Sequence, residues 1–204
     1  AEFDCTRNTV RRALSMLADE MFVQPIHGKG VRVIWLKGET DMLGALEEVE
    51  SFGEFAKRNN AVASTDVKSF EHLVCTEQLS RRLGFKVGEE LIRVVRVRSL
   101  NGSARQVDHG YFLESIAKGL TPEIAAESIY DYLEHKRGIK VMASRRTVSV
   151  ELANDEDCSY LDLGKYNCVA VMESQSYTSD GILFEVTHAR THPEIFHYHV
   201  NSKR

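Results

Sequence analysis

The sequence predicts a mixed α+β fold, in which a short N-terminal part precedes a larger, mainly antiparallel part. Two turn sequences, Asn101-Gly102 and Ser179-Asp180-Gly181, each separate a pair of strand-like segments. Helical segments lie between these hairpins, which disfavours a doubly wound parallel sheet. Residues 1–37 carry a net charge of +2, against −6 for the rest of the chain. We therefore expect a basic head over 1–37, a connection over 38–50 and a larger domain over 51–204.

A helix is predicted first, beginning at Thr6, whose hydroxyl is placed to cap it. Apolar residues recur along it at helical spacing and form one stripe, composed of Val10, Leu14, Leu17 and Met21. Polar and basic residues gather at the N-terminal end, mostly off that stripe: Arg7, Asn8, Arg11 and Arg12. DNA-reading helices place such residues at this end, where the helix dipole also favours phosphate.

A basic hairpin is predicted next. Strand-like segments at 22–26 and 31–35 flank the turn His27-Gly28-Lys29-Gly30. A helix followed by a basic-tipped hairpin is the order of a winged helix, whose Lys29 would reach toward phosphate or the minor groove. An α/β domain that binds no nucleic acid can also contain a helix, a hairpin and several arginines. The pattern alone therefore leaves both interpretations open.

The residues of these segments resemble the end of the DNA-binding domain of the GntR family of bacterial regulators. The resemblance rests on Thr-Arg-Asn-Thr-Val-Arg-Arg-Ala-Leu from Thr6, Leu-Ala-Asp-Glu from Leu17, and His-Gly-Lys-Gly-Val from His27. It implies an operator-reading helix and a wing, with DNA contacts from Arg7, Thr9, Arg11 and Lys29 and with Thr6 and Gly30 near the DNA backbone. Together with Asn8 and Arg12 at the start of the helix, these are the expected DNA-binding residues. The resemblance also implies two preceding helices, of which only the tail of the second (Glu2-Phe3) is expected here. We therefore expect an incomplete winged helix-turn-helix.

The larger part predicts a series of strands with helices inserted among them. Strands are expected over 63–73, 91–98, 104–113, 140–152, 168–178 and 184–192, with a tail to Val200. Helices are expected over 52–58, 76–83, 128–136 and 155–161, with another beginning at Thr121. The clearest helix signals are the Thr76 cap with its Gly84 stop, and the Thr121-Pro122 start.

This order resembles the UTRA effector-binding domain of the HutC branch of the GntR family, which shares its fold with chorismate lyase. Three markers carry the resemblance: Arg96-Val97-Arg98 with Asn101-Gly102, Glu127-Ser128-Ile129-Tyr130-Asp131-Tyr132-Leu133, and Asp180-Gly181-Ile182-Leu183-Phe184-Glu185. The segments Ser128–Glu134 and Leu161–Tyr166 look most like those of trehalose-operon repressors. The resemblance implies that the domain binds a small effector.

Arg96 and Arg98 are the candidate ligand-binding residues that the pattern itself indicates. They lie two apart on a predicted strand, so both point to one face, which they share with Ile92 and Val94. Two guanidinium groups on one face suit a phosphate or a carboxylate. Ion pairs with neighbouring strands, or simple solvation of that face, would explain the same pattern.

The resemblance implies a fuller site for a sugar phosphate. Arg96, Arg98, Ser128 and Tyr130 would hold the effector, Asp108 and Glu185 would bind sugar hydroxyls, and Ser51 matches a loop residue near the phosphate. Ser128 can equally be a simple helix cap. In this sequence Val186 replaces an aromatic residue of the family, and Asp108 is shorter than the usual glutamate.

Other classes of site have little support. The four cysteines lie far apart, without a Cys-x-x-Cys pair, which argues against a zinc site or a disulfide framework and for a reducing cytoplasm. His188 and His192 are four apart and His197 and His199 alternate, but they lie on strand-like sequence, so no metal is expected. No nucleophile motif, phosphate loop, dinucleotide fingerprint, signal peptide or membrane span is visible, and no cofactor is expected.

We therefore expect a cytoplasmic, homodimeric repressor that binds double-stranded operator DNA and responds to a sugar phosphate. Two alternatives stay open. The first is a regulator that responds to an organic acid or an amino acid, because paired arginines also suit a carboxylate. The second is an enzyme like chorismate lyase.

Overall fold

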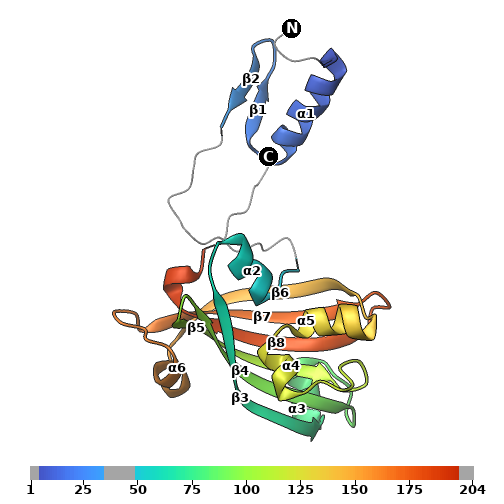
Figure 1. Cartoon of the computed structure of the whole chain (residues 1–204), viewed down its shortest axis with the longest axis vertical. Coiled ribbons are helices and arrows are strands. Elements are labelled where there is room, and N and C mark those ends of the chain that lie inside the picture. Colours follow the sequence, from blue (N-terminus) through green and yellow to red (C-terminus); the bar gives the residue numbers. More distant parts are fainter. Residues whose placement is uncertain (1–4, 35–48, 198–204) are drawn as a thin grey trace. The chain divides into compact units, whose positions relative to one another are not determined.

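The computed structural model describes residues 5–34 and 49–197, which belong to two compact units (Figure 1). Several predicted features lie outside the described residues: the Glu2-Phe3 helix tail, Trp35 to Lys37, nearly all of the 38–50 connection, His199, and the end of the tail to Val200. Within the described residues, no helix is long and apolar enough to cross a membrane.

The smaller unit contains α1 (Arg7–Asp19), β1 (Val23–Ile26) and β2 (Gly30–Val33). The Thr6 hydroxyl caps α1 by accepting a hydrogen bond from the Thr9 N–H at 3.2 Å. β1 and β2 pair antiparallel, with Ile26 opposite Gly30. Gly30 closes the turn at φ +94°, in the left-handed region that favours glycine.

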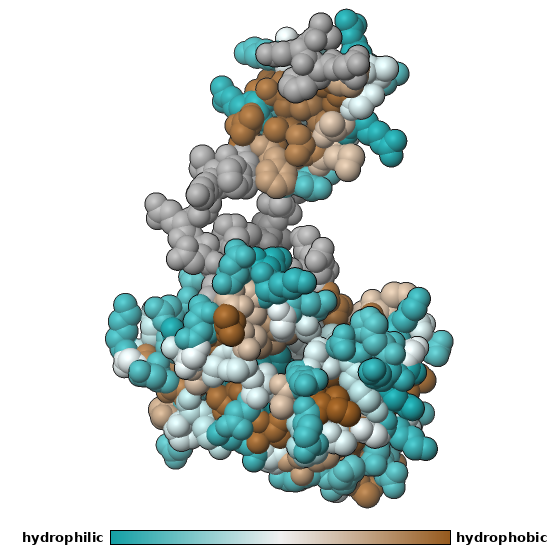
Figure 2. All heavy atoms as spheres, viewed as in Figure 1, coloured by the Kyte–Doolittle hydropathy of each residue, from teal (hydrophilic) through white to brown (hydrophobic). Residues whose placement is uncertain are grey.

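The apolar stripe predicted for this helix is not buried. α1 has no buried residue: Val10 and Leu17 of the stripe are exposed and Leu14 is half-buried. Figure 2 shows apolar side chains gathered on one face of this unit. Assigning Met21 to the helix was wrong, because α1 ends at Asp19 and Met21 follows with φ +62°.

The larger unit is built on six strands: β3 (Ala63–Val74), β4 (Glu90–Leu100), β5 (Ser103–Leu113), β6 (Val141–Leu152), β7 (Cys168–Thr178) and β8 (Leu183–Thr191). They form one sheet in the order β3-β4-β5-β8-β7-β6, with every neighbouring pair antiparallel. The predicted α+β class with a mainly antiparallel sheet is therefore confirmed.

Short helical segments connect the strands: α2 (Phe52–Arg58), α3 (Glu77–Leu83), α4 (Pro122–Ala126), α5 (Ile129–Asp131), the π-helical η1 (Tyr132–Lys136), α6 (Asp155–Tyr160) and the 3-10 turn η2 (Pro193–Ile195). Their caps follow the sequence signals, since Thr76, Thr121 and Ser128 each accept a hydrogen bond from the first turn. The single helix expected over 128–136 is in fact α5 continued by η1.

Apolar side chains pack on both faces of this sheet. Ile92 and Val94 on β4 join a large cluster that includes Ala125 of α4 and Ile129 of α5. Val95, which alternates with them, joins a second cluster on the opposite face. That second cluster is completed by Val107, Leu161, Leu163, Val169 and Val171. Apolar packing therefore covers both faces of the sheet where β4 and β5 run side by side.

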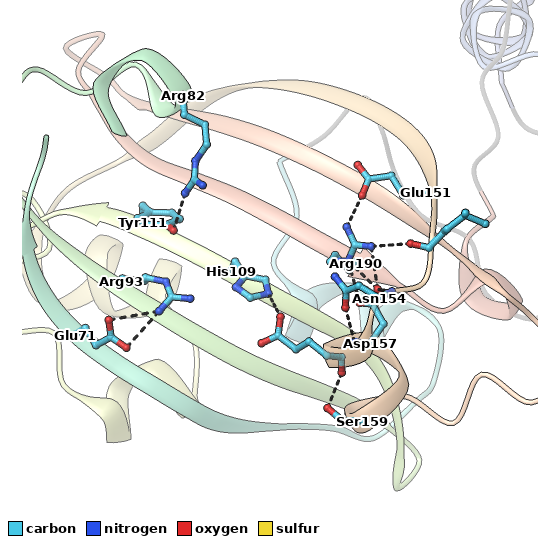
Figure 3. A network of polar contacts seen from close by, with 12 residues as sticks. Glu71, Arg82, Arg93, His109, Tyr111, Glu151, Asn154, Asp157, Ser159 and Arg190 are labelled. Carbon is cyan, nitrogen blue, oxygen red and sulfur yellow. Dashed lines mark hydrogen bonds and ion pairs between the residues drawn. The ribbon is translucent and has the colours of Figure 1, made fainter. Parts of the chain in front are cut away.

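The face that carries the second cluster also holds a polar network (Figure 3). Arg190 of β8 donates to both carboxylate oxygens of the fully buried Asp157, at 2.9 Å each, and to Glu151 at 2.5 Å. Asp157 also accepts from the backbone N–H of Asn154, which caps α6. This network fixes α6 to the sheet.

Candidate functional site

A cavity of about 550 Å³ lies in the larger unit, lined by side chains from all six strands and from the neighbouring segments. The structure brings together around it all seven residues that the resemblance singled out for the effector: Ser51, Arg96, Arg98, Asp108, Ser128, Tyr130 and Glu185. Because they come from β4, β5, β8 and the starts of α2 and α5, only the folded unit assembles them.

The two arginines converge on one carboxylate. Arg96 lies directly opposite Asp108 in the β4–β5 register. Its Nη2 is 2.5 Å from Asp108 Oδ2, and Arg98 Nη2 is 2.8 Å from the same oxygen. Arg98 also stacks over the Phe52 ring, with 5.1 Å from Cζ to the ring centroid. An ion pair with a neighbouring strand, which was one alternative explanation of the arginine pattern, is therefore present at the wall of the cavity.

This cluster has more positive charge than its one carboxylate balances. Arg96 and Asp108 are both nearly fully buried, and the Nε atoms of Arg96 and Arg98 have no hydrogen-bond partner within the described residues. Burial and the neighbouring Arg96 charge lower the pKa of Arg98. Burial would raise the pKa of Asp108, but the two arginines outweigh it and hold that pKa below its usual value. An additional anion would be stabilised here.

A second polar group joins Tyr130, Ser176 and Glu185 at the same cavity. Tyr130 Oη donates to Glu185 Oε2 at 2.5 Å and lies 3.1 Å from Ser176 Oγ. Burial raises the pKa of Glu185, and burial together with the Glu185 charge raises the pKa of Tyr130 well above its usual value. These groups offer hydrogen bonds to a neutral polar part of a ligand.

Both predicted serines also cap helices. Ser51 forms a capping box with Glu54, and the Ser128 hydroxyl accepts from the Asp131 N–H at 3.2 Å. The simpler capping interpretation of Ser128 therefore accounts for its position in the chain. Both residues still border the cavity.

Sequence reasoning missed Arg146 and Ser144, which line the cavity from β6. Ser144 Oγ is buried and has no partner within the described residues. Their alternation on a predicted strand indicated that they share a face. That signal did not indicate which face, because the position of β6 in the sheet depends on the non-sequential β5–β8 pairing.

The predicted DNA-contacting residues lie in the smaller unit, and all of them are exposed: Thr6, Arg7, Asn8, Thr9, Arg11, Arg12, Lys29 and Gly30. Five of the eight lie in the first two turns of α1, and Lys29 and Gly30 lie at the hairpin turn. Arg11 additionally lines a hollow between α1 and the hairpin, together with Leu14 and Val23.

The two histidines spaced four apart are engaged in local contacts. His188 lies 3.2 Å from Glu173, and His192 Nε2 lies 3.1 Å from the Asp162 carbonyl oxygen. Within the part of the chain that the structure describes, no three His, Cys, Asp or Glu side chains are placed to hold a metal ion. All four cysteines are free.

Comparison with protein families identifies a UTRA domain over residues 58–197. Among curated relatives, the HTH-type transcriptional regulator TreR of Bacillus subtilis (strain 168) is 29% identical over 198 residues, covering 97% of this chain and 82% of the relative. The HTH-type transcriptional repressor NagR of the same organism is 25% identical over 190 residues, covering 93% of this chain and 76% of the relative.

Solved structures show the same fold. The effector binding domain of the B. subtilis trehalose repressor (TreR) superposes with a TM-score of 0.61 at 27% identity, over 69% of this chain and 98% of that one. The possible transcriptional regulator YydK of B. subtilis subsp. subtilis str. 168 superposes with a TM-score of 0.73 at 22% identity, over 99% of this chain and 85% of that one.

Proposed function

The chain belongs to the UTRA-domain family of GntR/HutC-type transcriptional regulators, and from this premise we propose that it is a cytoplasmic repressor controlled by a sugar phosphate. In this proposal residues 1–37 contribute to operator binding, 38–50 connect, and 51–204 bind the effector. The effector is bound and released without turnover. A homodimer would place two copies of α1 on a palindromic operator.

The observation that carries the effector proposal is the buried arginine pair that shares Asp108. A phosphate group could accept hydrogen bonds from the unused donors of both guanidinium groups, because each has five. Arg146 adds a third positive charge at the cavity wall. The three arginines are balanced by Asp108 and by Glu185, whose raised pKa favours its neutral form. The resulting excess of positive charge favours a doubly charged anion over a neutral ligand.

The remaining cavity wall suits the sugar part of such a ligand. Hydroxyl side chains line it on several strands, namely Thr65, Ser144, Ser174, Thr187 and Thr191. The volume of about 550 Å³ falls within the range typical of small-molecule sites. The relative named as the trehalose repressor makes trehalose 6-phosphate the first probe to test.

Thermal unfolding of the full chain tests the proposal. Trehalose 6-phosphate and glucose 6-phosphate are compared with trehalose, inorganic phosphate, citrate and histidine. A ligand at about 100 times its dissociation constant stabilises the folded state by about 2.7 kcal/mol, which is a shift of several degrees. We expect this shift only with a sugar phosphate.

Arg98→Met is the informative variant, because Arg96 still neutralises Asp108 when Arg98 is gone. We expect it to weaken sugar-phosphate binding at least about tenfold, as the loss of a charged hydrogen bond does. Arg93→Met is the matched control, since Arg93 lies on the same strand but bonds Glu71 on the other face. A shift with citrate or histidine alone would favour the organic-acid alternative, and consumption of a ligand would favour an enzyme.

A further inference from the structure

One wall of the cavity comes from η2, close to the end of the described residues. Ile195 of η2 and the following Phe196 line the cavity, and Thr191 lines it from the end of β8. His192 lies between these residues in the chain and is buried, with 2% of its surface exposed. The proposed function gives this buried histidine no role.

Both ring nitrogens of His192 have a partner whose hydrogen-bonding role is fixed. The Glu194 backbone N–H donates to Nδ1 at 3.2 Å, so Nδ1 carries no hydrogen. Nε2 lies 3.1 Å from the Asp162 carbonyl oxygen, which can only accept, so Nε2 carries the hydrogen. The two partners together select the neutral imidazole with its hydrogen on Nε2.

These two bonds hold η2 in place. Through Nδ1 the ring caps the first turn of η2, and through Nε2 it connects that turn to the loop before β7. The His192 N–H also donates to the Arg105 carbonyl oxygen of β5 at 2.8 Å, and the Ile195 N–H donates to the His192 carbonyl oxygen at 3.2 Å. The positions of Ile195 and Phe196 therefore depend on His192.

We propose that His192 is a positioning residue of the effector cavity, whose neutral ring holds η2 in the position that the ligand needs. This inference rests on the proposed function and adds to it a residue that acts through η2. A second proton on the ring would go to Nδ1 and would face the Glu194 N–H, so the cap of η2 would be lost. Ligand affinity should therefore fall when His192 is protonated.

The groups around the ring favour its neutral form. Arg105 faces it from β5, Glu194 Oε2 lies 4.0 Å from Nδ1, Asp162 lies at Nε2, and the Tyr166 ring packs edge-on with 5.3 Å between centroids. Arg105 also donates to Glu194 at 2.8 Å. Burial and then the Arg105 charge lower the pKa of His192 below its ordinary value of about 6.5, although Glu194 opposes them. The ring is thus neutral above that value and gains its proton only at lower pH.

Nitrogen-15 NMR of the full chain without ligand tests the hold on η2. We expect a hydrogen on Nε2 and none on Nδ1 above about pH 6.5, and a Glu194 amide resonance that shifts as the ring gains its proton. In His192→Asn the side-chain oxygen replaces Nδ1 as the cap, so this titration should disappear. A hydrogen on Nδ1, or a Glu194 amide that does not respond to His192, would overturn the proposal.

Isothermal titration with trehalose 6-phosphate from about pH 8 to about pH 5 tests the effect on binding. The phosphate of the ligand and Glu185 titrate in every variant, so the pH profiles are compared between variants. At pH 8 we expect His192→Asn to bind within about threefold of the parent chain, and His192→Leu, which cannot cap η2, to bind at least about fivefold more weakly. Toward pH 5 the parent chain should lose at least about fivefold more affinity than His192→Asn.

His188→Asn is the matched control. His188 is a half-buried histidine of β8 whose pKa burial also lowers, but it lies beside Glu173 on the other face, between the cavity-lining Thr187 and Ala189. This variant should keep the pH profile of the parent chain. Equal losses of affinity in the parent chain and His192→Asn would overturn the proposal. Absence of sugar-phosphate binding at every pH would count against the proposed function instead, and the Glu194 amide would still show whether His192 holds η2.

Discussion

Asp108 holds two buried guanidinium groups together. Its single oxygen Oδ2 accepts from both Arg96 and Arg98. Asp108→Asn removes the negative charge and leaves two neighbouring positive charges without a counter-ion. We expect the free energy of unfolding, measured by urea titration with circular dichroism, to fall by about 3–5 kcal/mol, as when one partner of a buried ion pair is removed.

The contribution of the Asp108 charge to stability decreases at acid pH. The arginines hold the pKa of folded Asp108 below the ordinary aspartate value of about 3.9. Its stabilising contribution is therefore complete above that value and is lost as the pH falls through the lower, folded-state pKa. The difference between the parent chain and Asp108→Asn should shrink at acid pH. The exposed Asp131→Asn serves as control and should change stability by no more than about 0.5 kcal/mol.

At the scale of elements, α6 shows how a six-residue helix is held in place. Asp157 caps it through Asn154 and also forms the buried ion pair with Arg190 (Figure 3). Asp157→Asn removes that charge, although Glu151 still pairs with Arg190. We expect a loss of about 3 kcal/mol in the free energy of unfolding, at the low end for a broken buried pair.

The matched control lies in the same helical turn. Asp155 is exposed, so Asp155→Asn should cost no more than about 0.5 kcal/mol. Hydrogen exchange of the α6 amides would locate the effect, because loss of the anchor should speed exchange there more than in β4. Equal losses from the two variants would mean that the ion pair does not anchor the helix.

Local signals in the sequence predicted the individual elements of the fold but not the order of the strands in the sheet. Caps such as Thr76 and turns such as Asn101-Gly102 are local signals, and the elements that they bound were predicted to within a few residues. The family resemblance was confirmed by the UTRA match. Long-range order was not predictable, because the β5–β8 pairing and the edge position of β6 depend on packing of the whole sheet.

One bulge decides the geometry of the candidate site. A regular hairpin closed by Leu100 and Ser103 would place Asp108 opposite Val95, on the other face of the sheet. The register shift between Arg98 and Ser99 adds one residue on β5 and brings Asp108 opposite Arg96 instead. The arginine spacing predicted a shared face, but the bulge that supplies their carboxylate left no recognisable sequence signal.

At the scale of the whole molecule, control of DNA binding by an effector must be reciprocal. If the sugar phosphate lowers operator affinity by some factor, the operator must lower sugar-phosphate affinity by the same factor, in the typical range of about 5–150. Operator DNA selected by the chain from a random library and isothermal titration would measure both factors. Arg98→Met should bind this DNA normally but lose the coupling. Arg7→Ala on the exposed start of α1 should keep effector binding, weaken DNA binding and reduce the salt dependence by about one counter-ion. A coupling factor of one would contradict control by the sugar phosphate, and coupling that survives in Arg98→Met would mean that the sugar phosphate acts from somewhere other than the cavity of the larger unit.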